Sequence, residues 1–505
     1  MNSLRSNFLY NIFLTIGSQL MALIVFPYVS RVLGPSNFGA VNFIDATADN
    51  FIILATMGMT TLGVREIVIN RNNPIALSAT FSSLFLLNTI STGVALALMM
   101  CAYLFLPNLS CYPEMMLVAC AKVIFSFLQI NWLFAGLEQF KFISLRTLAI
   151  KVLYVIGVFV FVRNTDDYNI YFILLVGMTA ANAIANLYYS RRFVRLKFSE
   201  AHWRPYVAPF FFLGLYMICT CIYNTLNMMI LGVLSTTDQV GYFSFSAKLF
   251  AIITGIYYAF TSAAMPRMCS LLVDEKTKEF SSYITRTSRT VTQLAIPIII
   301  FGIIFASQIT YVVSGPQYDA AVPSMRILFP MLYFLGMEKI LIEQILMPLK
   351  RDRLLLRNAM IAAGVAIACD ILFVDSLGAT GCAIAWLSAE FTIFTLSITS
   401  TSKYLTFADL AKEAKTTVLY YLPLIPVLIL VTYLRINPGW IFAIGAVVFT
   451  VYFICLQYYF VRNSDILNFL HLTHEKKSAA RNKPSTTTRL QSNRITQRNI
   501  VSGDR

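Results

Sequence analysis

The sequence predicts an all-α polytopic membrane protein with about fourteen transmembrane helices. Three observations predict this class: 58% of the residues are hydrophobic, only 12% are charged, and apolar stretches of roughly twenty residues recur along almost the whole chain. A soluble domain cannot carry this pattern. The first stretch, near residues 8–32, is too long for the apolar core of a signal peptide and lacks a small-residue cleavage site, so it is expected to remain as the first helix.

Twelve of the expected spans form two sets of six on either side of a basic linker. Breaks at Gly, Pro, Asn and charged residues place the spans near residues 8–32, 39–63, 78–106, 114–134, 147–162, 170–189, 207–234, 241–265, 290–313, 323–347, 358–374, 380–401, 417–434 and 439–461. We therefore expect five parts: an N-terminal six-helix bundle (1–190), a basic cytoplasmic linker (191–206), a C-terminal six-helix bundle (207–402), helices 13 and 14 (403–461), and a disordered, basic cytoplasmic tail (462–505).

Lysine and arginine gather in alternate loops. The linker alone carries Arg191, Arg192, Arg195, Lys197 and Arg204, whereas the opposite set of loops holds only Arg163 and Arg435. Because basic residues near span ends stay on the cytoplasmic side, both termini are predicted to be cytoplasmic. An even number of spans is then required, in agreement with fourteen.

Composition also argues against several classes of site. The net charge is +15, but the cations are spread over short loops, so we expect no nucleic-acid partner. The 9 cysteines lie mostly in apolar segments without paired spacing, as buried residues do. His202, His471 and His474 fall in the linker and tail, and no phosphate-binding loop motif is present. We expect no catalytic residue, metal or cofactor, and no ATP hydrolysis within this chain.

A short pattern occurs twice. Residues 31–39 read Arg-Val-Leu-Gly-Pro-Ser-Asn-Phe-Gly, and residues 232–241 read Gly-Val-Leu-Ser-Thr-Thr-Asp-Gln-Val-Gly. Both have a Val-Leu exit from one span, a polar turn and a glycine at entry into the next. Transporters are commonly built from such paired halves, with the substrate site at their interface.

With two further segments, at residues 131–140 and 344–352, the chain resembles the polysaccharide (O-antigen type) flippase family of the MATE-like exporter superfamily, over roughly the first twelve spans. The resemblance implies two six-helix bundles around a cavity, related by a pseudo-repeat, that work by alternating access. It implies a non-enzymatic flippase in the bacterial inner membrane that moves an undecaprenyl-diphosphate-linked oligosaccharide to the outer face, for surface polysaccharide biosynthesis. We expect a monomer in contact with membrane lipid, with glycan polymerase and ligase machinery as further candidate partners.

An anionic, sugar-bearing head group needs buried positive and polar side chains, because ionisable groups within spans face a cavity or a partner. Arg31 follows the helix-kinking Pro27 near the outer end of the first span, where it either contacts the diphosphate or reaches the interface. Lys122 and Lys248 lie deep in their spans and are predicted to bind substrate. The alternative is a buried ion pair with a carboxylate such as Glu390, Asp370 or Asp45. Lys151 is expected to reach the interface.

Two polar stripes complete the predicted site. Asn42, Asp45 and Asp49 share one helix face, since they are three and four residues apart. The two aspartates are predicted to gate transport or couple it to an ion, and a fixed salt bridge between helices is the alternative. Asn224 and Asn227 are predicted to hydrogen-bond the cargo, or else to join helices.

Two other functions compete with this reading. A multidrug or cation-coupled exporter of the same superfamily would require a carboxylate-lined pocket, whereas the cations within these spans favour an anionic cargo. An outer-face polysaccharide polymerase or ligase would require a sizeable outward loop, and every outward loop here is short. The glycan carried and the coupled ion, H⁺ or Na⁺, are left open.

Overall fold

The computed structural model describes residues 2–197, 199, 202–221, 225–273, 277–349 and 351–461, and within these ranges the regular elements are all helical. The chain divides into two units, residues 1–450 and 451–505. The second unit is described only as far as residue 461, where it contains the end of α19 and a π-helical turn, Gln457–Val461. The expected tail, 462–505, lies outside the described residues.

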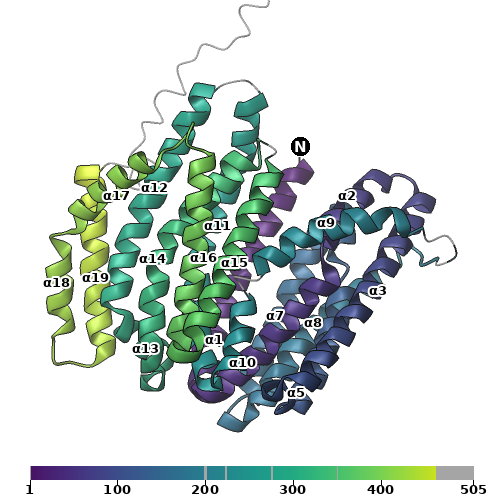
Figure 1. Ribbon diagram of the computed structural model, residues 1–505, viewed down its shortest axis with the longest axis horizontal. Coiled ribbons are helices and arrows are strands. Elements are labelled where there is room, and N and C mark those ends of the chain that lie inside the picture. The colour runs from purple at the N-terminus through teal and green to yellow at the C-terminus, as the bar shows by residue number, and fades with distance from the viewer. Residues whose placement is uncertain are drawn as a thin grey trace, which may run out of the picture. The chain divides into compact units, whose positions relative to one another are not determined.

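The first half of the chain contains eight α-helices (Figure 1). They are α1 (Asn2–Thr56), α2 (Met59–Asn70), α3 (Pro74–Phe105), α4 (Pro107–Ser110), α5 (Pro113–Leu128), α6 (Asn131–Gly136), α7 (Phe140–Phe161) and α8 (Tyr168–Ser190), with a 3-10 turn η1 (Thr165–Asp167) before α8. We call residues 2–190 the N-terminal half.

The remaining helices begin after the basic linker. They are α9 (Arg204–Cys221), α10 (Asn227–Leu234), α11 (Thr237–Val273), α12 (Thr277–Ile304), α13 (Ala306–Ser314), η4 (Pro316–Ala321), α14 (Val322–Lys339), η5 (Ile340–Leu346), α15 (Asp352–Leu377), α16 (Ala379–Ser400), α17 (Phe407–Tyr421), α18 (Leu424–Thr432) and α19 (Pro438–Leu456). We call residues 204–450 the C-terminal half.

The lengths and apolar compositions of the helices make this a multi-pass membrane protein, as the sequence predicts. Within the described ranges, 10 helical stretches are long and apolar enough to cross a membrane, or up to 11 if α17 and α18, bent by 55°, form one span. One of these stretches, Gly17–Asn70, is 54 residues long. It contains the greater part of the first two expected spans.

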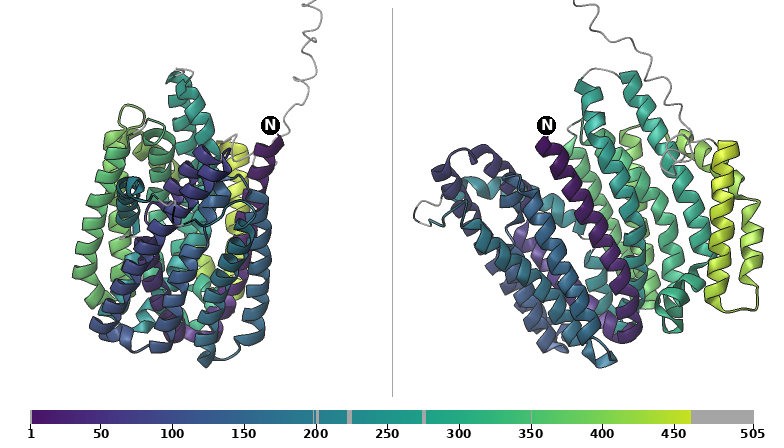
Figure 2. Two further views of the ribbon diagram at one scale, coloured as in Figure 1. Left: turned by 90° about the vertical axis from the view of Figure 1, so that its right-hand side faces the viewer. Right: turned by 180° about the vertical axis from the view of Figure 1, so that it is seen from behind.

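A kink divides α1. Gly34 has φ 71° and ψ 173°, outside the helical region, and Pro35 follows it. Glycine adopts such a backbone conformation at little cost, and proline removes an amide donor from the helix. The first arm of α1 runs from the N terminus to this kink (Figure 2). The Gly-Pro pair thus explains why one continuous stretch supplies two expected spans.

The principal core joins the two halves around α1. This helix packs against α3, α5 and α7 of its own half and against α10 and α11 of the other. Val29 and Ile44 of α1 are fully buried in one hydrophobic cluster with Phe245 of α11. A second cluster surrounds Trp132 of α6, between α2 and α3. Because α1 packs against helices of both halves, polar side chains on it can reach either half.

The basic linker lies along α3. The backbone amides of Arg195, Lys197 and His202 donate hydrogen bonds to serine hydroxyls on this helix, over 3.3, 2.9 and 2.8 Å. The accepting residues are Ser78, Ser82 and Ser83. The described part of the linker is therefore fixed to the N-terminal half through its backbone, and its cationic side chains remain exposed.

Candidate functional site

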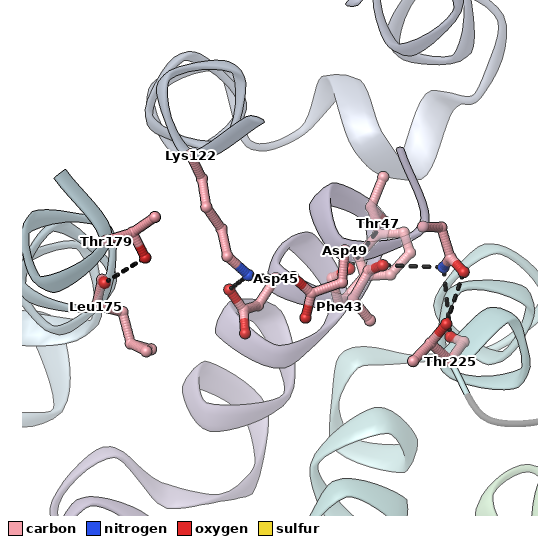
Figure 3. Close-up of polar contacts among 10 residues, drawn as sticks. Phe43, Asp45, Thr47, Asp49, Lys122, Leu175, Thr179 and Thr225 are labelled. Carbon is pink, nitrogen blue, oxygen red and sulfur yellow. Dashed lines mark hydrogen bonds and ion pairs between the residues drawn. The ribbon is translucent and has the colours of Figure 1, made fainter. Parts of the chain in front are cut away.

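Lys122 of α5 forms an ion pair with two carboxylates of α1. Its Nζ lies 2.6 Å from Oδ1 of Asp45 and 2.5 Å from Oδ1 of Asp49 (Figure 3). The lysine side chain is 10% exposed, whereas the two aspartates are 23% and 43% exposed. One ammonium group facing two carboxylates leaves one negative charge in excess.

The same turn of α1 contacts the C-terminal half. Asn50 accepts a hydrogen bond through Oδ1 from the hydroxyl of Thr225, two residues before the start of α10, over 2.8 Å. Its amide group also donates to the carbonyl of Ala46, over 2.9 Å. Asn42, by contrast, donates to the carbonyl of Phe38 on its own helix, over 2.6 Å. The turn of α1 that carries the ion pair therefore also contacts the C-terminal half, through Asn50.

A cavity of about 300 Å³ lies between the two halves. Its walls come from the first arm of α1 and from α7, α8 and α11. The lining residues are Ser18, Gln19, Met21, Ala22, Val25, Phe26, Lys151, Tyr154, Tyr171, Met178, Lys248, Ala251 and Ile252. Two lysines, two tyrosines, an amide and a hydroxyl line it, and in the described part of the chain no carboxylate does. This donor-rich surface suits an anionic, hydroxylated ligand.

The two cavity lysines come from opposite halves. Lys248 of α11 places its Nζ 4.5 Å from the ring centroid of Phe38, a cation–π contact. Lys151 of α7 lines the cavity together with Tyr154 of the same helix and Tyr171 of α8. An anion held by both lysines would therefore touch both halves.

Sequence reasoning missed Lys151, which was expected to reach the membrane interface. The structure places it in the cavity wall instead. A usable signal was its spacing from Tyr154: residues three apart share a helix face, so an ammonium and a phenol project together.

The other predicted residues lie in different surroundings. Arg31 is exposed and donates from Nε to the carbonyl of Val313, over 2.9 Å, and from a terminal nitrogen to the carbonyl of Val312. It does not line the cavity. Asn227 of α10 is buried at 1% exposure and is likewise not among the lining residues. Asn224 lies outside the described residues.

The structure also distinguishes the alternative carboxylate partners. Lys122 is paired with Asp45 and Asp49, not with the other two candidates. Asp370 is fully buried, and neither carboxylate oxygen has a hydrogen-bond partner among the described residues. Glu390 accepts a hydrogen bond from the indole of Trp386, over 3.3 Å. No group of three or more His, Cys, Asp or Glu that could hold a metal occurs in the described ranges.

Comparisons with known sequences agree on one family. The family model described as "Polysaccharide biosynthesis protein" matches residues 4–272, more than half of the chain. Two relatives carry the description "Putative O-antigen transporter". The one from Escherichia coli (strain K12) is 23% identical over 349 residues, which cover 67% of this chain and 82% of the relative. The one from Shigella dysenteriae is 24% identical over 400 residues, covering 75% and 95%.

Comparisons with solved structures identify the fold. The inward closed conformation of the lipid II flippase MurJ aligns with a TM-score of 0.72 at 15% identity, over 90% of this chain and 99% of MurJ. An inward-facing multidrug resistance transporter of the MATE family aligns with a TM-score of 0.58 at 13% identity, over 79% of this chain and 96% of that one. At these identities, the likeness shows a MurJ/MATE-like fold and no more.

Proposed function

The chain belongs to the polysaccharide biosynthesis protein family, and on that premise we propose that it flips an undecaprenyl-diphosphate-linked oligosaccharide from the cytoplasmic to the outer face of the bacterial inner membrane. The protein is a membrane transporter and not an enzyme. The observation that carries the proposal is the cavity between the halves, which is lined by Lys151 and Lys248 without a carboxylate in the described part of the chain.

The chemistry of the cavity fits the head group of such a cargo. A diphosphate ester has several anionic oxygens, each able to accept a charge-assisted hydrogen bond from an ammonium group. Gln19, Tyr154 and Tyr171 can hydrogen-bond sugar hydroxyls on the same walls. The polyprenyl chain can remain in lipid, where it has no desolvation cost. The membrane potential contributes about 2.3 kcal/mol per negative charge per 100 mV towards outward movement.

Alternating access is supported by the origin of the cavity walls. Lys151 belongs to the N-terminal half and Lys248 to the C-terminal half, so a bound head group would be held by both. We propose about fourteen membrane crossings, two of them supplied by α1, with both termini in the cytoplasm. These would form two six-helix bundles, 1–190 and 207–402, around the cavity, followed by two further helices.

We further propose that the Lys122 ion pair responds to the cargo or to a coupled ion. Its excess carboxylate can take up H⁺ or Na⁺, and an arriving diphosphate would compete with Asp45 and Asp49 for the ammonium group. Arg31 and Asn227 lie away from the cavity. Contact between either residue and the cargo would therefore require another conformation of the transporter.

Cation export is the competing function, and the excess carboxylate beside Lys122 is the observation that favours it. A cationic substrate would bind at Asp45 and Asp49, but it would have to compete with Lys122, which is paired with both carboxylates. It would also be repelled by the two lysines in the cavity. The anionic cargo therefore agrees better with the geometry.

The test is to determine on which side of the inner membrane the lipid-linked oligosaccharide accumulates in cells that lack this gene. Complementation should use the wild type, Lys248→Ala and the control Lys403→Ala, since Lys403 is exposed and does not line the cavity. We expect cytoplasmic accumulation, relieved by the wild type and Lys403→Ala but not by Lys248→Ala. Normal translocation in cells without the gene would refute the flippase function. If those cells were instead more sensitive to drugs, the protein would be a multidrug exporter.

A further inference from the structure

The kink of α1 leaves backbone carbonyls that a side chain of the other half binds. Pro35 has no amide hydrogen, so the carbonyl of Arg31 has no helical donor four residues ahead. Gly34 is also non-helical, which disturbs the helical hydrogen bond between its amide and the carbonyl of Ser30. Gln317 of η4 donates from Nε2 to the carbonyls of Arg31 and Ser30, over 3.1 and 3.4 Å. A glutamine of the C-terminal half thus donates hydrogen bonds to the carbonyls that the helix break in the N-terminal half leaves without helical partners.

The reverse arrangement holds at the end of α13. Helix ends leave carbonyls without intrahelical donors, and these carry the negative end of the helix dipole. Arg31 donates to two of them, those of Val312 and Val313. The hydroxyls of Ser30 and Ser314 lie 2.5 Å apart between these contacts, and both serines are fully buried. Each half therefore caps a broken or terminal helix of the other. We call Ser30, Arg31, Ser314 and Gln317 the clasp.

The clasp lies beyond a buried aromatic layer. Phe26, which lines the cavity, has its ring centroid 5.6 Å from Phe245 and 6.1 Å from Phe38. Tyr318 of η4 lies 5.2 Å from Phe245. Arg31 is five residues past Phe26, or about 7 Å further along the helix. Along α1, the order is thus cavity, aromatic layer and clasp, towards the end of the bundle away from the N terminus (Figure 1).

A second contact of the same type occurs at this end. Asn108 of α4 donates from Nδ2 to the carbonyls of Gly232 and Val233, over 3.0 and 2.8 Å, in the last turn of α10. Here too a side chain of one half caps a helix terminus of the other. The acceptors are backbone carbonyls at helix ends, and water can take the place of the donor when the halves separate. Such contacts hold the two halves together at this end, and they can break when the halves separate.

We propose that Arg31 is a positioning residue that holds the cavity closed at the end of the bundle away from the N terminus, with Gln317 as its reciprocal partner. The proposal rests on the proposed function, because it treats this end as an exit for cargo. Arg31 then acts through helix ends rather than through contact with the diphosphate. Weakening the clasp shifts the population towards a state that is open at this end.

The test measures access to the cavity directly. Ala251→Cys, in the cavity wall, is placed in a version of the full chain whose native cysteines are replaced, and it is labelled with a membrane-impermeant thiol reagent. Reagent is applied from the outside of cells and, separately, to inverted vesicles. We expect Arg31→Gln to raise labelling from the outside about tenfold, equivalent to about 1.4 kcal/mol, and to lower labelling in inverted vesicles. Arg31→Lys, which keeps a cation but not the fork of donors, should have a smaller effect.

Three further variants keep the test decisive. Arg326→Gln is the matched control, because Arg326 is an exposed arginine near the start of α14 with no polar contact shown in the described part of the chain. If Arg31→Gln fails to insert, Gln317→Leu and Asn108→Ala weaken the same closure from other positions, and they should also raise outside labelling. Unchanged labelling in properly inserted variants would overturn the proposal.

Labelling needs no cargo, so this result is independent of the flippase assay. A changed labelling rate in a protein that moves no lipid-linked glycan would retain the clasp and reject the proposed cargo. Lost transport with unchanged labelling would reject the clasp and return Arg31 to the cargo site.

Discussion

Gly39 of α1 and Gly241 of α11 pack reciprocally, each against the backbone that precedes the other glycine. A Cβ atom on Gly39 would lie 1.8 Å from the carbonyl oxygen of Thr237, and one on Gly241 would lie 2.0 Å from that of Pro35. In both cases, the residue approached stands four positions before the partner glycine. These are the glycines of the repeated pattern at residues 31–39 and 232–241. The pattern thus marks a close backbone approach between the two halves.

The first prediction concerns this crossing. Gly39→Ala and Gly241→Ala should each destabilise the protein by about 1–3 kcal/mol, because the added methyl group meets backbone that must move. Gly93→Ala is the control, because nothing lies within 4 Å of a Cβ at this exposed position of α3. Thermal unfolding of the detergent-purified proteins measures the effect. A Gly39→Ala protein as stable as Gly93→Ala would show that the helices cross less tightly than described.

The second prediction concerns the kink. Gly34→Ala should cost about 1–3 kcal/mol, because a side chain is strained at φ 71° and ψ 173°. Gly364→Ala, in the exposed interior of α15 with open space around it, should be neutral or stabilising by up to about 1 kcal/mol. The two variants make the same chemical change, but Gly34→Ala should lower the unfolding temperature, whereas Gly364→Ala should leave it unchanged or raise it. A shift of equal sign and size would contradict the role assigned to the backbone at Gly34.

The helical class, and a break between residues 32 and 39, could be predicted from the sequence because they depend on local properties, although the sequence indicated a turn between two spans where the structure has a kink within one helix. Apolar length predicts membrane spans, and Gly and Pro within an apolar run indicate a local break in the helix. The spacing of Asp45 and Asp49 likewise predicts a shared helix face. The partner of Lys122, by contrast, depends on how α5 packs against α1. The sequence does not show this packing, so three carboxylates remained possible partners.

The position of a charged residue along its expected span was a poorer guide to its surroundings. Lys151 lies near the start of its expected span, where a lysine can extend to the interface, yet it lines the cavity. Arg31 lies near a span end as well, and its partners are backbone carbonyls. Carbonyls at a helix terminus leave no mark in the sequence of a distant segment, so this contact could be found only in three dimensions.

The third prediction concerns the Lys122 ion pair. Lys122→Ala should destabilise the protein by about 1–3 kcal/mol, since it leaves two partly buried carboxylates without their partner. Asp45→Asn should cost more than Asp49→Asn, because Asp49 is 43% exposed and water screens its charge. The triple variant Lys122→Met, Asp45→Asn, Asp49→Asn should recover most of the loss. Unfolding of all four proteins tests this order, and additive losses in the triple variant would show that the three residues do not interact.

The last prediction concerns Lys151, the cavity residue that the sequence did not reveal. Lys151→Ala should reduce transport of the lipid-linked oligosaccharide at least about tenfold, because a hydrogen bond to a charged group contributes about 1.5–3 kcal/mol. Lys151→Arg should retain most activity, since the positive charge and donors remain. The measurement is the rate of flipping in vesicles that contain the purified protein, with Lys403→Ala as the control. Because Lys151 and Lys248 come from different halves, each single variant should slow transport about as much as both together if the cargo must bridge the halves. Losses that multiply would mean that the two lysines contribute independently, and the bridging arrangement would then be wrong.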